Sequence, residues 1–436
     1  MRRHRGGNRF MTEGMWRAAW CVALLGCWSE EPLVDGVFTP EQWAFIQQMQ
    51  LPPDPPRCPV GLSGDVCDRA ADFGHTLFFE PKLSGPITID SPDALGPVGA
   101  VGVIKCADCH DPKHFFVDTR SQPAQQVSLG ADYTGHNALG LVNVAYKSQV
   151  ADQLCDPDAP VCKQVYSWTG IYPSPEQVLI LAGLKGAAMN STEGRMADVI
   201  HDDPQYQLLY HELFGGYAPT DDPKQPGCAP TETPCHAAHE VFTNLGLAFA
   251  AYVRHLNTKA SPFDCYLSDG TADGCDEKTP VFGPAEKRGL AVFTGKGTCS
   301  DCHSGSLLSD LKFRNTGVPQ EGAHVKIDDV GLAKTTGDPA DTGKFLTPPL
   351  RNVSETGPYM HAGQLGSLHD VIAYYRQGGV VAGFSGIKDA RIQPLEIDDD
   401  EAADLEAFLR SLTSLPLEAN LTCNPKHAKP ALDACP

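Results

Sequence analysis

The feature that most constrains this chain is a five-residue motif that occurs twice. Cys-Ala-Asp-Cys-His begins at Cys106, and Cys-Ser-Asp-Cys-His begins 193 residues later at Cys299. Two cysteines at this spacing, followed directly by histidine, can form thioethers with the vinyl groups of a haem while the histidine binds its iron. Zinc or redox sites are disfavoured because no partner ligand pair lies at zinc spacing. The sequence therefore predicts two covalently bound haem c groups, attached at Cys106, Cys109 and His110 and at Cys299, Cys302 and His303.

The order of predicted elements is similar on both sides of the chain. A chain of 436 residues is long enough for two domains. Each half shows a helical stretch, a haem motif, a long loop and a further helix, and strand-like alternation is scarce. We therefore expect a mainly α fold with two cytochrome c-like domains, one haem in each. The helical patterns cover residues 72–79, 205–214, 241–257, the stretch from Pro284 and residues 398–412, with one more opening at Ser174.

Composition suggests where the domains begin and end. We expect a signal peptide, a Pro/Gly-rich tether or wrap that is not part of a core, a first haem domain that binds peroxide, a linker, a second haem domain for electron transfer, and a tail. The signal peptide covers residues 1–27, the tether 28–70 and the first haem domain 71–260. The linker covers residues 261–279, the second haem domain 280–415 and the tail 416–436.

The sixteen cysteines also indicate the cellular compartment. Four belong to the haem motifs, and Cys21 and Cys27 lie in an N-terminal apolar segment. The other ten form close pairs in polar loop sequence, which indicates five local disulfides and an oxidising compartment. These pairs are Cys58 with Cys67, Cys155 with Cys162, Cys228 with Cys235, Cys265 with Cys275, and Cys423 with Cys435.

The N-terminus has the pattern of an export signal. Residues 1–17 are basic, and the apolar run that follows them is too short to span a bilayer. The stretch from Leu24 to Cys27 resembles a bacterial lipoprotein cleavage box, which predicts a periplasmic protein with a lipid on Cys27; simple cleavage and release is the alternative. The formal charge of −20 argues against nucleic acid and anionic membranes as partners and favours a basic or neutral protein.

Three segments of the second half carry a family resemblance. Residues 345–353, 356–363 and 367–372 together resemble the signature of the bacterial di-haem cytochrome c peroxidase and MauG superfamily. The resemblance extends over residues 72–415, with the haem motifs, the stretch from Leu141 to Tyr146, Trp168 and the final helix in the expected order. It implies a hydrogen-peroxide-dependent haem oxidoreductase, closer to the tyrosine-ligated MauG branch.

The resemblance implies an open first haem. Where ordinary peroxidases of the family carry a dissociable distal histidine, this chain has Gln126, and His136 is the remaining candidate to close that face. His114 is too near the motif to reach it. Glu193 matches the family's acid-base glutamate, although Ser191 replaces the proline of that pattern, and Gln177 is a weaker match to its distal glutamine.

The second haem has two candidate distal ligands. Tyr375 stands where MauG-type enzymes carry tyrosine and cytochrome peroxidases carry methionine, and Met360 is the alternative. A phenolate would lower the haem potential and a thioether would raise it. Tyr374 points about 100° away from Tyr375 on a helix, so the two tyrosines cannot both bind the iron.

Two further sites follow from the resemblance. Trp168 matches the tryptophan that passes oxidising equivalents between the two haems. A calcium site between the domains is implied, with side-chain and carbonyl oxygen ligands suited to a hard cation. Its ligands would be Asn137, Thr356 and Pro358.

The expected activity is peroxide reduction at the first haem and oxidation of a protein partner through a high-valent two-haem state, with MauG-like side-chain oxidation favoured. The alternative is a cytochrome c peroxidase that takes electrons from a small cytochrome or cupredoxin. A third reading is a di-haem electron carrier without peroxide chemistry.

Overall fold

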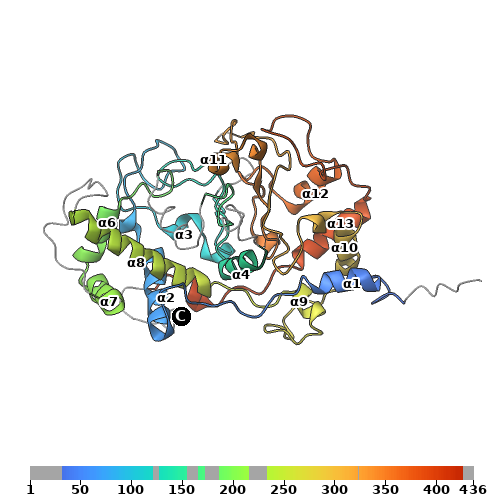
Figure 1. Ribbon diagram of the computed structural model, residues 1–436, viewed down its shortest axis with the longest axis horizontal. Coiled ribbons are helices and arrows are strands. Elements are labelled where there is room, and N and C mark those ends of the chain that lie inside the picture. Colours follow the sequence, from blue (N-terminus) through green and yellow to red (C-terminus); the bar gives the residue numbers. More distant parts are fainter. Residues whose placement is uncertain are drawn as a thin grey trace, which may run out of the picture.

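The computed structural model describes residues 32–120, 127–154, 165–171, 186–215, 233–322 and 324–425. Helices and loops make up nearly all of this part of the chain (Figure 1). Two short strands, β1 (Phe313–Arg314) and β2 (Phe345–Leu346), pair antiparallel and form the one named sheet of the described residues. The mainly α prediction is confirmed. No helix in the described ranges is long and apolar enough to span a membrane.

The first half is built on two helices that cross closely. The predicted stripe of α8 is buried at every position, from Val241 to Leu256. Its partner α2 approaches through Gly74, where a Cβ atom would lie 2.1 Å from the Ala248 carbonyl oxygen. Such a crossing requires glycine. The helices of this half are α2 (Gly64–Phe78), α3 (Cys106–Cys109), α4 (Val144–Leu154), α6 (Glu193–Asp202), α7 (Pro204–Phe214) and α8 (Thr233–His255).

The second half repeats this arrangement with α10 and α13. A Cβ atom on Gly289 would lie 1.9 Å from the Asp404 carbonyl oxygen, so this crossing also requires glycine. Asp398 caps α13 and forms a capping box with Glu401. The helices here are α9 (Pro262–Leu267), α10 (Pro284–Thr294), α11 (Ala333–Thr336), α12 (Leu368–Arg376), α13 (Asp399–Arg410) and α14 (Ala419–Thr422).

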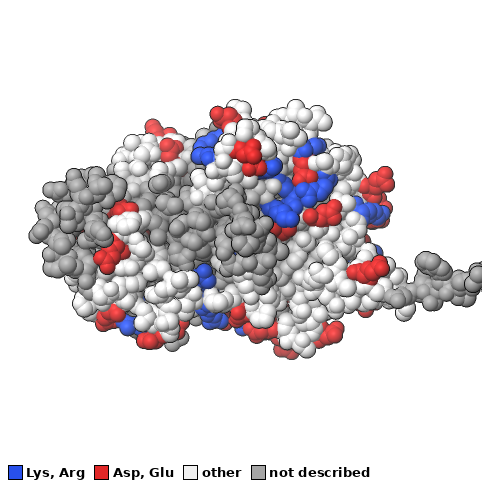
Figure 2. Space-filling model, in the orientation of Figure 1, with Lys and Arg blue, Asp and Glu red and all other residues white. Residues whose placement is uncertain are grey.

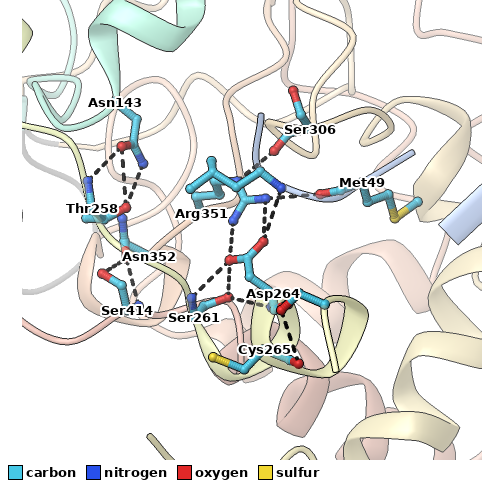
Figure 3. A network of polar contacts seen from close by, with 12 residues as sticks. Met49, Asn143, Thr258, Ser261, Asp264, Cys265, Ser306, Arg351, Asn352 and Ser414 are labelled. Carbon is cyan, nitrogen blue, oxygen red and sulfur yellow. Dashed lines mark hydrogen bonds and ion pairs between the residues drawn. The ribbon is translucent and has the colours of Figure 1, made fainter. Parts of the chain in front are cut away.

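An asparagine anchors the end of the long helix in each half. Asn143 has a φ of 64° and Asn352 a φ of 65°. The Asn143 N–H donates to the Leu256 carbonyl just after α8, and the Asn352 N–H donates to the Leu412 carbonyl just after α13. Their side chains bind Thr258 and Ser414, respectively (Figure 3). The internal repeat thus extends to single residues.

The two ends of the described chain cross over between the halves. The segment around α1 (Pro40–Gln47) packs into the core of the second half, where Phe38, Ile46 and Met49 are fully buried. The tail returns to the first half, where the Tyr252 hydroxyl donates to the Leu421 carbonyl. Figure 1 shows α1 beside α9 and α10, with the C-terminal end near α2. The expectation that residues 28–70 form a tether outside any core is therefore wrong for α1, because its apolar side chains find a partner surface far along the sequence.

Disulfides join Cys58 to Cys67 and Cys265 to Cys275, and Cys423 is also disulfide-bonded. Two further predicted pairs fall wholly or partly outside the described residues: Cys155 with Cys162, and Cys228 with Cys235. Cys435 also lies outside them, as do the helix expected from Ser174 and the signal segment with Cys21 and Cys27.

Candidate haem centres

The two histidines of the motifs are oriented alike. His110 donates its Nδ1–H to the Phe116 carbonyl at 3.0 Å, and His303 donates to the Leu308 carbonyl at 2.9 Å. Each ring therefore keeps Nε2 for a metal. Burial lowers the pKa of His303 to about 4 and lowers the pKa of His110, so both rings are neutral.

The four motif cysteines take part in no disulfide; Cys106 and Cys109 lie in α3, and Cys299 and Cys302 lie in and directly after the short helix Cys299–Asp301. Burial raises the pKa of Cys106, Cys109 and Cys299 to about 12, so these groups are neutral thiols and not reactive thiolates. Two cysteine side chains beside a histidine with a free Nε2 fit thioether attachment of a haem.

A largely apolar cavity of about 280 Å³ surrounds the second motif. Cys299, Cys302 and His303 line it, with aliphatic walls that include Leu350, Ile372, Leu405 and Leu409. An apolar enclosure beside two thiols and a neutral histidine fits a haem macrocycle.

Both candidate distal ligands line this cavity. Tyr375 enters it from α12 and Met360 from the loop before that helix. Tyr374 points elsewhere, and its hydroxyl donates to the Thr316 carbonyl at 3.0 Å. The two tyrosines therefore point in different directions, as expected for neighbouring residues of a helix. The choice between Tyr375 and Met360 stays a prediction.

A buried ion pair holds the loop that follows His303. Arg351 and Asp264 meet in a bidentate contact of 2.7 and 2.9 Å, with side chains 3% and 1% exposed. Arg351 also donates to the carbonyls of Ser306 and Met49 (Figure 3). Burial alone would raise the pKa of Asp264, but the Arg351 guanidinium and the Ser261 hydrogen bonds hold it below its ordinary value.

This ion pair was not predicted. Arg351 entered the sequence reasoning only as one letter of the family signature. The available signal was the repeat itself: Leu-Val-Asn-Val ends at Val144 and Leu-Arg-Asn-Val at Val353, so a partly buried valine of the first half corresponds to a buried arginine of the second.

The predicted calcium ligands and Trp168 gather where the halves meet. The Asn137 Nδ2 donates to the Pro358 carbonyl at 3.2 Å, and the Trp168 Nε1 donates to the Asn137 carbonyl at 2.9 Å. Leu346 donates in turn to the Trp168 carbonyl. Thr356 lines the same cavity as these three residues. The three predicted calcium ligands thus line one cavity, and Trp168 is hydrogen-bonded to residues of both halves.

His136 makes its contact with the second half. Its Nε2 lies 2.7 Å from the Asp329 carboxylate, and its ring lies beside Phe345, which lines the cavity of the second motif. The distal position Gln126 is outside the described residues. His114 is at the surface, bonded to Asp111 at 2.7 Å.

Glu193 begins α6, and its carboxylate lies 3.2 Å from Nδ1 of His239 on α8. Both side chains are partly exposed. Glu193 does not line the cavity that contains Trp168, so the structure does not bring these two predicted residues together. Gln177 is outside the described residues.

The chain is similar to known proteins over most of its length. A family model described as di-haem cytochrome c peroxidase matches residues 68–272. The cytochrome-c peroxidase IdrP2 of Pseudomonas sp. (strain SCT) is 32% identical over 79% of this chain and 82% of its own. The methylamine utilization protein MauG of Methylorubrum extorquens is 27% identical over 84% of each chain.

A solved structure has the same fold. It is described as a MauG-like protein associated with microbial copper homeostasis, has a TM-score of 0.60 and 24% identity, and matches 86% of this chain and 98% of its own. Together with two haem motifs of matching local geometry, these similarities establish that the chain belongs to the di-haem cytochrome c peroxidase and MauG family of haem oxidoreductases.

Proposed function

We propose that this protein reduces hydrogen peroxide at the haem bound by His110 and uses the oxidising equivalents to oxidise a side chain of a partner protein. Family membership supports peroxidase chemistry. When bound, the haems supply the redox chemistry: one reacts with peroxide, and the other shares the oxidising equivalents. The observation that carries the proposal is the position of Trp168, which lines the cavity of the second motif and is hydrogen-bonded to residues of both halves.

The chain's own residues would hold and tune the two centres. His110 and His303, each held by a backbone carbonyl, fix the metal-binding nitrogens. Glu193 would move a proton between the two peroxide oxygens, and Gln177 would assist it. Asn137, Thr356 and Pro358 would hold calcium beside Trp168.

Tyr375 is the basis for preferring protein oxidation. A tyrosinate bound to the second iron would lower its potential, which would make it a poor acceptor for electrons from a high-potential cytochrome. Met360 also lines the cavity, so a cytochrome c peroxidase with a small cytochrome or cupredoxin as donor is the second candidate. A non-enzymatic electron carrier is the third.

The setting of the reaction is also part of the proposal. We place the protein in the periplasm, lipid-anchored through Cys27, with a redox partner or substrate protein there. Figure 2 shows Asp and Glu spread over the visible face and a group of Lys and Arg between α11 and α12, so this face presents both signs of charge to a partner.

Near-infrared spectra of the ferric protein test the ligand choice. We expect no thioether-to-iron band in the wild type, no change in Met360→Leu, and a changed ferric spectrum in Tyr375→Phe. A wild-type thioether band that disappears in Met360→Leu would instead favour the cytochrome c peroxidase. Turnover of peroxide with a reduced cytochrome as the only donor should be slow in the wild type and faster in Tyr375→Met.

A further inference from the structure

We propose that Lys147 is the built-in counter-ion of a haem carboxylate at the interface between the halves. Lys147 lies on α4 and lines the cavity that contains the second haem motif and Trp168. Its side chain is almost completely buried, with 5% of the residue exposed. Among the hydrogen bonds and ion pairs of the described residues, none involves its ammonium group, and burial is the one influence on its pKa.

The other cations of the cavity wall differ from Lys147 in this respect. Each is an arginine paired with an aspartate of this chain: Arg314 with Asp310, Arg351 with Asp264, and Arg391 with Asp389. Lys147 is thus the cavity-lining cation for which the described residues offer no anion.

A buried, unpaired ammonium group is costly. Burial lowers the pKa of Lys147 to about 8, which leaves the group mostly charged at pH 7. Moving such a charge out of water costs several kcal/mol unless an opposite charge accompanies it. Each haem brings two carboxylates, and the fit of the motif residues to haem supplies the missing anion without any further component.

The internal repeat explains why the cation is at this position. Lys147 is four residues after the anchor Asn143, and Thr356 is four residues after the anchor Asn352. Both line the same cavity. Equivalent positions of the two halves therefore face the interface, and the first half supplies a fixed positive charge where the second supplies a predicted calcium ligand.

Loss of the Lys147 charge should lower the reduction potential of the haem beside it. A nearby cation disfavours ferric iron, which is the more positive oxidation state, and so raises the reduction potential. Removing one charge beside the haem should change the equilibrium constant for its reduction roughly tenfold, which corresponds to about 59 mV for a one-electron couple. The potential of one haem should fall in Lys147→Met and stay near the wild-type value in Lys147→Arg.

The experiment measures haem content and both midpoint potentials in the holoprotein. Lys147→Met is compared with Lys334→Met, which removes an exposed lysine of α11 and should change neither potential. Lys147→Gln keeps an N–H donor without the charge and gives the same readout if the methionine variant does not accumulate.

The inference rests on the haem assignment of the proposed function but not on its peroxide chemistry. Two haems per chain with both potentials unchanged in Lys147→Met and Lys147→Gln would overturn the role of Lys147 and leave the peroxidase proposal intact. Absence of haem from the wild type would remove both, and a lowered potential without peroxide turnover would remove only the peroxidase.

Discussion

The two halves of this protein use one backbone frame with different side chains beside it. Gly74 and Gly289 occupy equivalent helix crossings, and Asn143 and Asn352 anchor equivalent loops. The residue before the second anchor is Arg351, whereas Val142 precedes the first. The residue after Gly74 is His75, whereas Leu290 follows Gly289. The glycines and asparagines are thus determined by the backbone, and the halves acquire different chemistry at the neighbouring positions.

The largest effect should come from breaking the ion pair that only the second half contains. Arg351→Met leaves the buried Asp264 carboxylate with hydrogen bonds from Ser261 but without its cation, which should destabilise the protein by about 3–5 kcal/mol. Val142→Ala, at the equivalent position of the first half, should cost less than about 1.5 kcal/mol. Urea unfolding followed by circular dichroism measures both.

The double variant Arg351→Met with Asp264→Leu is the control for this pair, since removing both charges should recover most of the lost stability. Equal, small effects of Arg351→Met and Val142→Ala would show that the halves do not differ here.

His75 should make the first half sensitive to acid. Burial lowers its pKa to about 4, although its Nε2 is bonded to the Cys423 carbonyl. The unfolded chain takes up this proton below about pH 6.5 and the folded chain does not, so stability should fall by about 3 kcal/mol as the pH drops from 6.5 to 4.

His75→Leu copies the second half and should remove this pH dependence, at the loss of about 1 kcal/mol at pH 7.5 for the hydrogen bond. The comparison of the wild type with His75→Leu over this pH range isolates the contribution of His75. Identical slopes in the wild type and His75→Leu would contradict the buried neutral histidine.

The two helix crossings should respond alike to a methyl group. Gly74→Ala and Gly289→Ala each force a Cβ atom against a backbone carbonyl, so each should destabilise the protein by about 1–3 kcal/mol. Gly194→Ala on α6, where a Cβ meets nothing within 4 Å, should stabilise by up to about 1 kcal/mol. Thermal unfolding of the three variants measures these changes in stability. If alanine were tolerated at only one of the two crossings, the crossings would not be equivalent.

The smallest expected effect concerns the two anchor asparagines. Glycine and alanine variants there separate the cost of the backbone conformation from the loss of the side-chain hydrogen bonds. Asn143→Gly and Asn352→Gly lose the side-chain bonds but tolerate the positive φ, whereas alanine at either site also carries about 1–2 kcal/mol of left-handed strain. The difference in the free energy of unfolding between the alanine and glycine variants should therefore be the same in both halves, as measured by chemical denaturation. Unequal differences would show that the two anchors are not equivalent.

Sequence patterns predicted the features that depend on neighbouring residues. The haem motifs, the buried face of α8 and the helix α13 each lie in one continuous stretch, where spacing alone indicates the structure. The separation of Tyr374 from Tyr375 likewise followed from helix geometry.

Features that depend on distant partners were missed. The core role of α1 depends on a surface more than two hundred residues away, and Arg351 lies 87 residues from Asp264. His136, the remaining candidate to close the first haem, contacts Asp329, 193 residues away, and this contact leaves no local trace in the sequence.

The central claim is an open first haem coupled to a second haem bound by Tyr375. Electron paramagnetic resonance of the ferric protein, before and after one equivalent of hydrogen peroxide, tests it most directly. The account predicts one high-spin and one low-spin signal that change together on addition of peroxide. Two low-spin signals that peroxide leaves unchanged would contradict it and support a simple electron carrier.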